Sequence, residues 1–238
     1  AIDSVPLTAI AFFMLTGELM TSATITDRLV ALSRALIGRI RGGLAQVNVL
    51  VSMFFAGMNG SVVADTATVG ALVLPAMKKA GYPAAFSAAV TGVSSTIGGI
   101  IPPSIMMIVL ANATEISIAS LFAAGIVPGI LIGVVIMVIN HYFAVKYNFE
   151  RSDEPFSVRR AGKELYRSSF ALLIPLDLVG SVMGGVASVV EAGAITALVA
   201  LFTGVFVYRT IKWKDCTGAF RRAFRNSAMV FIIIAASG

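Results

Sequence analysis

Long apolar runs alternate with short polar or basic stretches along the whole chain. A run of about 20 apolar residues is long enough to cross a bilayer as a helix. Five runs approach or exceed this length, and they occupy residues 5–24, 84–112, 121–145, 170–187 and 192–208. The spacing of these runs predicts an all-α polytopic membrane protein.

The composition agrees with this interpretation and excludes several other classes of protein. Hydrophobic residues make up 58% of the 238 residues and charged residues only 13%, whereas soluble domains carry about 25% charged residues. One cysteine and one histidine are too few for a disulfide scaffold or a zinc site. The sequence also lacks a P-loop, a GxGxxG, an HExxH and a GxSxG motif, so we expect no enzyme.

The basic residues are confined to four clusters between the apolar runs. The clusters comprise Arg28 to Arg41, Lys78 with Lys79, Lys146 to Arg167, and Arg209 to Arg225. Basic residues concentrate in cytoplasmic loops, so we expect all four clusters on the inner side, near anionic lipid. The clusters contain no interleaved aromatic patch, and we expect no nucleic-acid partner. Residues 26–41, 149–168 and 213–226 are predicted to lie in the inner interface of the bilayer.

Residues 44–77 are predicted to form a re-entrant helical hairpin. Two apolar arms, 44–58 and 62–77, flank the polar turn at Asn59, Gly60 and Ser61. Each arm is roughly 23 Å long as a helix, short of the hydrocarbon core of about 30 Å. We therefore expect the hairpin to enter from the inner side and to turn within the membrane.

Residues 84–112 are predicted to form a broken transmembrane helix. Pro102 and Pro103 lack a backbone donor and clash with a preceding helical turn. The helix is expected to break near them and to restart around Ser104.

The hairpin tip and the broken helix together predict a binding site. Helix ends expose carbonyls and amides that carry partial charge, and broken membrane helices use them to hold Na⁺ and anionic substrates. The predicted cation ligands are Gly60, Ser61, Ser94, Ser95, Thr96 and Gly98, with Na⁺ as the metal. The predicted substrate-binding residues are Asn59, Ser61, Ser95, Pro103 and Ser104. Alternatively, these hydroxyls bond to their own helices or allow close helix packing.

Three acidic residues are further candidates, because an ionisable group within a membrane is often functional. Asp65 follows the hairpin tip by one helical turn, and its alternative role is to interact with the helix N-terminus. Glu18 lies on the first apolar run, near a membrane boundary or in a polar cluster between helices. Glu191 lies at the predicted outer turn 188–191, where it could cap the next helix.

Several of these stretches resemble the large membrane subunit of the tripartite ATP-independent periplasmic (TRAP) transporters. The resemblance is carried by FFAGMNGSVVADTATVGALVLPAMKKAGY at 54–82, SSTIGGIIPPSIMMIVL at 94–110, LFAAGIVPGIL at 121–131 and GSVMGGVASVVEAGAIT at 180–196. It implies an elevator-type fold like that of the ion transporter superfamily. It further implies Na⁺-coupled import of a small organic anion, such as a C4-dicarboxylate or sialic acid, through the bacterial inner membrane. The implied partners are a small four-helix membrane subunit and a periplasmic substrate-binding protein.

The same resemblance suggests how the chain is organised. Residues 1–41 are expected to form a scaffold-type span with an inner amphipathic helix, and 42–112 the transport-type region. Residues 113–168 would add the span 121–145 and an inner interfacial segment. Residues 169–238 would begin an incomplete second half, with a second hairpin expected after Gly238. An ion channel built on the same hairpin and a noncatalytic scaffold in a membrane complex remain open alternatives.

Overall fold

The computed structural model describes residues 5–23, 25–149 and 156–237, and every regular element in these ranges is a helix. The side chains of Val5, Pro6, Asn59, Trp213 and Ser237 lie outside this description. The helices are α1 (Val5–Ser22), α2 (Ile25–Ile37), α3 (Gly43–Asn59), α4 (Val62–Lys79), α5 (Ala84–Ser95), the 3₁₀ turn η1 (Thr96–Gly99), α6 (Ile105–Thr114), α7 (Ile118–Lys146), α8 (Val158–Met183), α9 (Val189–Phe202), the π turn η2 (Thr203–Val207) and α10 (Trp213–Ser237). The predicted all-α class is confirmed.

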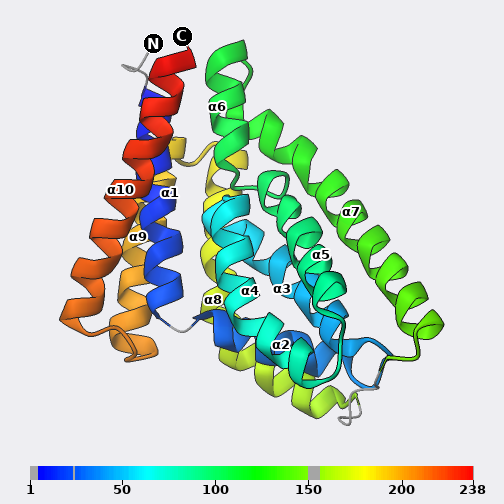
Figure 1. The fold of residues 1–238 in the computed structure, drawn as a ribbon. Coiled ribbons are helices and arrows are strands. Elements are labelled where there is room, and N and C mark those ends of the chain that lie inside the picture. The colour runs from blue at the N-terminus through cyan, green and yellow to red at the C-terminus, as the bar shows by residue number, and fades with distance from the viewer. Residues whose placement is uncertain (1–4, 24, 150–155, 238) are drawn as a thin grey trace.

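Helix α3 is the central element of the larger of two helix groups (Figure 1). It packs against α2, α4, α5, α7, α8 and η1, and Val47, Val51 and Phe55 on it are buried. A helix that is apolar on all sides is stable only when other helices surround it. The smaller group consists of α1, α9 and α10, in which α1 packs along both α9 and α10.

Within the described ranges, three helices are long and apolar enough to cross a membrane. They are α7, α8, and α9 with its π turn, over Val189–Val207. Helices α1 and α2 meet this criterion only together, as a pair bent by 72°. The predicted spans 121–145 and 192–208 are confirmed as apolar helices of sufficient length, and the chain is a multi-pass membrane protein.

The amphipathic helix predicted over 26–41 is shorter than expected. Helix α2 ends at Ile37 because Gly38 turns the backbone to a φ of 58°, a conformation that glycine adopts without strain. Arg39 and Arg41 therefore lie in a loop rather than on the polar side of the helix.

The interfacial segment predicted over 149–168 and the span predicted over 170–187 belong to one helix rather than two elements, and their placement in a membrane remains a prediction. Helix α8 runs without interruption from Val158 to Met183, and residues 150–155 lie outside the described ranges. Strong helix formers fill the junction, and no glycine or proline occurs between Gly162 and Pro175, so nothing breaks the helix where the polarity changes.

The basic helix predicted over 213–226 and the new segment predicted from 227 likewise belong to one helix, and their placement in a membrane remains a prediction. Helix α10 is continuous from Trp213 to Ser237. Its sequence changes from basic to apolar near Asn226 without a helix-breaking residue. The interfacial role expected of the Trp213 side chain falls outside the described part of the structure.

The outer turn predicted at 188–191 lies a few residues earlier. Helix α8 ends at Met183, Gly185 adopts a φ of 67°, and α9 begins at Val189. Ser188 and Glu191 thus belong to the start of α9 and not to the turn.

The hairpin and the broken helix are both present as helical features. The hairpin arms α3 and α4 contain 17 and 18 residues, and each is therefore roughly 26 Å long. The run 84–112 is split into α5 and α6 by η1 and a non-helical segment around Pro102 and Pro103. The depth of the hairpin in a membrane remains a prediction.

Candidate functional site

The hairpin tip is a two-residue turn made by Gly60 and Ser61. Gly60 ends α3 with a left-handed φ of 59°, and its N–H donates to the carbonyl of Ala56 at 3.3 Å. Ser61 caps α4, since its hydroxyl accepts a hydrogen bond from the N–H of Ala64 at 3.4 Å. The chain thereby reverses direction while both helix ends keep hydrogen-bond partners.

The break in the second element is held by one serine. The Ser104 hydroxyl donates to the carbonyl of Gly99 at 2.8 Å and accepts from the N–H of Met107 at 3.4 Å. It therefore caps α6 and also fixes the end of η1 across the non-helical segment. The restart predicted around Ser104 is confirmed, with α6 beginning at Ile105.

The tip and the break are in direct contact. The Ile105 N–H donates to the Gly60 carbonyl at 3.2 Å. A Cβ atom added to Gly60 would lie 2.4 Å from the Pro103 carbonyl oxygen, and one added to Gly98 would lie 3.7 Å from the Ser61 backbone. Residues of the hairpin tip and of the broken helix thus form one junction, and Gly60 permits the close approach of the two backbones.

Four helix ends meet at this junction. The C-terminal ends of α3 and η1 contribute carbonyls with partial negative charge, and the N-terminal ends of α4 and α6 contribute amides with partial positive charge. The arrangement offers neutral oxygens to a cation and N–H groups to an anion without requiring a buried arginine.

A buried polar network lies next to the junction, between α3 and α5. The Asn48 amide donates to the Thr91 hydroxyl at 2.7 Å, and the Ser94 hydroxyl donates to Asn48 Oδ1 at 3.2 Å. Ser52 joins the network through Ser94 Oγ at 3.3 Å. Asn48, Ser52 and Thr91 were not predicted as site residues from the sequence. Their signal was the four-residue spacing of Asn48 and Ser52, which places both on one helix face.

Asp65 is fully buried beside this network, in the first turn of α4. The Ser52 and Ser95 hydroxyls are near its carboxylate, and each also has another acceptor within reach. Ser52 donates to Ser94, and Ser95 donates to the Thr91 carbonyl at 2.8 Å. Among the described residues, neither carboxylate oxygen has a hydrogen-bond partner. A buried carboxylate without donors is unfavourable unless a cation or a proton neutralises it.

The predicted cation ligands occupy different positions around the junction. Gly60, Ser61 and Gly98 adjoin one another at the tip. Ser94 and Ser95 are buried and face the polar network and Asp65. Thr96 is exposed, and its hydroxyl donates to the Val93 carbonyl at 2.7 Å. Their binding roles remain predictions.

The predicted substrate-binding residues also converge on the junction. Pro103 and Ser104 adjoin Gly60 from the side of the broken helix, and Ser61 and Ser95 are placed as described above. The side chain of Asn59 lies outside the described part of the structure, so its role also stays a prediction.

Two of the candidate acids lie elsewhere and have structural partners. Glu18 on α1 accepts hydrogen bonds from Arg222 Nε at 2.6 Å and from Asn226 Nδ2 at 3.2 Å, both on α10. The predicted polar cluster between helices is therefore present. Glu191 forms a capping box with Ser188 at the start of α9. This is the helix-capping role that the sequence suggested for it.

These features define the class of the protein: a multi-pass helical membrane protein with polar groups gathered where its helices are broken. Residues 1–238 match the family described as the tripartite ATP-independent periplasmic transporter, DctM component, and the chain belongs to this family. Its relatives are named as transporter permeases, and permeases are not enzymes.

Three relatives illustrate the range of named substrates. The chain is 36% identical over 96% of its length to the C4-dicarboxylate TRAP transporter large permease protein DctM of Pseudomonas aeruginosa, covering 53% of that protein. It is 34% identical over 98% of its length to the sialic acid TRAP transporter large permease protein SiaM of Vibrio cholerae, covering 54%. It is 34% identical over 99% to the 2,3-diketo-L-gulonate TRAP transporter large permease protein YiaN of Escherichia coli, covering 55%. The chain thus spans about half the length of these relatives.

Proposed function

We propose that this chain forms part of the large permease subunit of a Na⁺-coupled secondary transporter that imports a small organic anion. The observation that carries the proposal is the junction itself, where the hairpin tip bonds to the broken helix next to an unpartnered, buried Asp65. The carbonyl ends of helices and the Asp65 carboxylate can bind a cation, and the amide ends of helices can bind an anion. Their presence in one place suits the joint binding of both ions.

The coupling cation is Na⁺, held near the tip by Gly60, Ser61, Ser94, Ser95, Thr96 and Gly98. Hard cations prefer oxygen ligands, and hydroxyls, carbonyls and the Asp65 carboxylate supply them. Binding of one cation would compensate the charge of Asp65, whose oxygens have no other partner in the described structure.

The transported anion is a carboxylate that binds near Asn59, Ser61, Ser95, Pro103 and Ser104. The N-terminal ends of α4 and α6 adjoin there, and amides at helix N-termini attract anions. The names of the three relatives all specify carboxylic acids or their anions, which favours this substrate class.

Transport proceeds by an elevator motion in which hairpin and broken helix move as one body. Close packing supports this, since a Cβ added to Gly60 at the hairpin tip would lie 2.4 Å from the Pro103 carbonyl oxygen of the broken helix. Interfaces this tight are difficult to separate. A periplasmic substrate-binding protein delivers the anion, and a small four-helix membrane subunit completes the permease.

The protein resides in the bacterial inner membrane with its basic loops in the cytoplasm. The C-terminal ends of α4, α7 and α9 and the N-terminal end of α8 lie at one end of the molecule (Figure 1). Three of the four basic clusters follow or begin these helices, so this end carries much of the charge that favours the cytoplasm.

The test is uptake by the complete permease in proteoliposomes, with its small subunit and binding protein. Ser61→Val and Ser95→Val should each abolish Na⁺-dependent uptake, because each removes a hydroxyl from the junction. Thr217→Val, on the exposed part of α10, is the matched control and should keep uptake. Unchanged Na⁺ dependence in both serine variants would contradict the site.

Two outcomes would favour the alternative functions. Flux that needs neither Na⁺ nor the binding protein would favour an ion channel. Full transport after Pro102 and Pro103 are both replaced by leucine would favour a noncatalytic scaffold, because the break in the helix would then be dispensable.

A further inference from the structure

A loop between α2 and α3, residues 38–42, is fixed against the C-terminal part of α7. Gly42 adopts a φ of 71°, and a Cβ on it would lie 2.4 Å from the Ala144 Cβ. One turn into α3, Gln46 Nε2 donates to the Met137 carbonyl of α7 at 2.8 Å. The loop therefore sits on α7 next to Ala144, and its neighbouring side chains have a fixed position relative to that helix.

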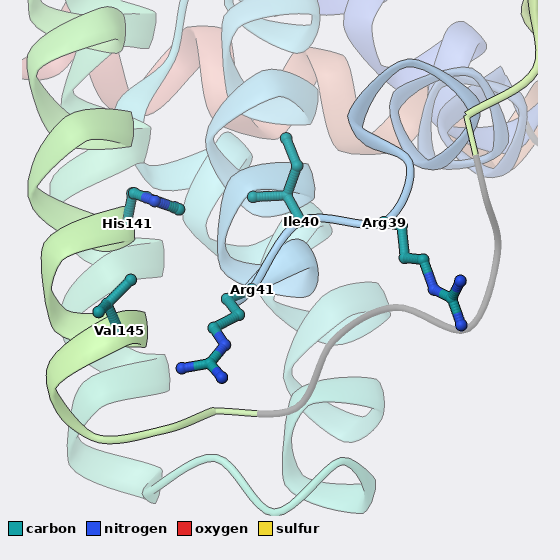
Figure 2. A pocket seen from close by; sticks show the side chains of 5 residues that line it. All are labelled: Arg39, Ile40, Arg41, His141 and Val145. Atoms are coloured by element: carbon teal, nitrogen blue, oxygen red, sulfur yellow. The ribbon is translucent and has the colours of Figure 1, made fainter.

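This contact creates an open pocket of about 590 Å³. Its lining residues are Arg39, Ile40 and Arg41 from the loop and His141 and Val145 from α7. Figure 2 shows His141 pointing toward Ile40, Arg41 extending beside α7, and Arg39 extending from the other end of the loop. The pocket thus has donors on both walls.

The chemistry of the lining selects an anion. Within the described residues, Arg39 and Arg41 form no ion pair, whereas Arg167 and Arg222 do. None of the described residues that line the pocket is a carboxylate. Guanidinium groups bind phosphate oxygens with paired, charge-assisted hydrogen bonds, and the imidazole adds a further donor.

An apolar track leads away from the pocket along α7. Ile40 is 40% exposed and Val145 is 49% exposed. Further exposed residues follow at helical spacing on α7, namely Tyr142, Val138, Val134, Leu131 and Val127. From Val145 to Val127 the track is roughly 27 Å long, close to the thickness of the hydrocarbon core.

We propose that this pocket binds the headgroup phosphate of an anionic phospholipid, with the acyl chains along the exposed face of α7. Basic pockets at the membrane surface are suited to such headgroups, and the apolar track distinguishes a lipid from a soluble phosphate. The site is separate from the hairpin junction, so it depends on neither the transported anion nor Na⁺. The bound lipid would hold the α2–α3 loop and the end of α7 at the membrane surface.

Native mass spectrometry of the complete permease tests this directly. The purified protein is titrated with phosphatidylglycerol or with zwitterionic phosphatidylcholine. The double variant R39Q/R41Q should weaken phosphatidylglycerol binding roughly 25-fold, since each basic residue near a lipid surface contributes about fivefold. R221Q/R225Q removes the same charge from the exposed side of α10 and should leave binding within about twofold of the unchanged protein.

Two further arms separate the sources of phosphate. Long-chain phosphatidylglycerol should bind at least about tenfold more tightly than the dihexanoyl form, and millimolar inorganic phosphate should not displace it. Equal affinity in R39Q/R41Q and the unchanged protein, equal affinity for the two headgroups, or displacement by inorganic phosphate would each overturn the proposal. Equal weakening in the control double variant would also overturn it, because the effect would then reflect net charge alone.

Discussion

Two carboxylates on membrane helices have opposite surroundings. Glu18 joins α1 to α10, and both of its oxygens accept hydrogen bonds, from Arg222 and Asn226. Asp65 joins no pair of helices in this way, since both oxygens lack partners among the described residues although Asp65 is fully buried. The Glu18 carboxylate thus has hydrogen-bond donors for both oxygens, whereas the described residues supply none to the Asp65 carboxylate.

The comparison separates a structural charge from a candidate binding charge. A paired carboxylate stabilises the packing of its helices and leaves nothing to bind. A buried carboxylate without partners destabilises the fold unless something outside the chain neutralises it. Asp65 lies one turn from the hairpin tip, where the Asp65 N–H donates to the Ser61 carbonyl at 3.0 Å, so a cation at the junction would supply that charge.

The largest expected effect comes from neutralising the unpaired carboxylate. Asp65→Asn should lower the apparent Na⁺ affinity of uptake by about 10- to 100-fold, the loss typical of a weakened metal site. Glu18→Gln should leave that affinity unchanged. The measurement is uptake against Na⁺ concentration in proteoliposomes, and equal curves for the two variants would remove the distinction between the carboxylates.

The second effect concerns the contact that brings Asp65 close to the junction. Gly60→Ala should destabilise the protein by about 2–5 kcal/mol, because it combines a left-handed backbone with a Cβ placed 2.4 Å from the Pro103 carbonyl oxygen. Gly81→Ala is the matched control, since Gly81 has a φ of 78° but no atom within 4 Å of its Cβ. It should cost only about 1–2 kcal/mol.

Thermal unfolding in detergent measures both glycine variants. If the unfolding temperature falls no further in Gly60→Ala than in Gly81→Ala, the close approach of the hairpin tip and the broken helix is absent.

A smaller effect is expected at the restart of the broken helix. Ser104→Ala should cost about 1–2 kcal/mol, because the hydroxyl both caps α6 and bonds to the Gly99 carbonyl. Ser117→Ala removes a cap from α7 at an exposed position and should cost less, about 0.5–1 kcal/mol. Guanidinium unfolding of both variants shows which one loses more stability. A larger loss in Ser117→Ala would argue against the hydrogen bond from Ser104 to the Gly99 carbonyl.

The smallest effect is expected at the paired carboxylate. Glu18→Gln should cost under about 1 kcal/mol, since Arg222 is 45% exposed and an exposed ion pair contributes little. Asp65→Asn should by contrast stabilise the protein in Na⁺-free buffer, because it removes an uncompensated charge. Unfolding temperatures without Na⁺ test this difference in sign, and destabilisation by both changes would contradict it.

The sequence was sufficient for the features that local chemistry dictates. Two consecutive prolines, Pro102 and Pro103, strongly disfavour a continuous helix, and Gly60 permits the reversal at the tip, so the hairpin and the break were predictable. The end of α2 at Gly38 follows from the same rules but was missed, because the basic residues Arg39 and Arg41 continued the polar pattern.

Other features depend on packing or on long-range contacts. Helices α8 and α10 continue through a change from basic to apolar sequence, because nothing in the backbone marks the membrane boundary. The pairing of Asn48 with Thr91 depends on which face of α3 meets α5. The missing partners of Asp65 depend on where the Ser52 and Ser95 hydroxyls direct their hydrogens. None of these features can be predicted from the spacing of residues along the sequence alone.

The most direct test of the central claim is the stabilisation of the complete permease by Na⁺. A ligand that binds only the folded state raises its stability by mass action. Replacing K⁺ by Na⁺ at constant ionic strength should raise the unfolding temperature of the unchanged protein and of Glu18→Gln by the same amount, and should have no effect on Asp65→Asn. An equal Na⁺-induced rise in Asp65→Asn, or no rise in the unchanged protein, would contradict the account.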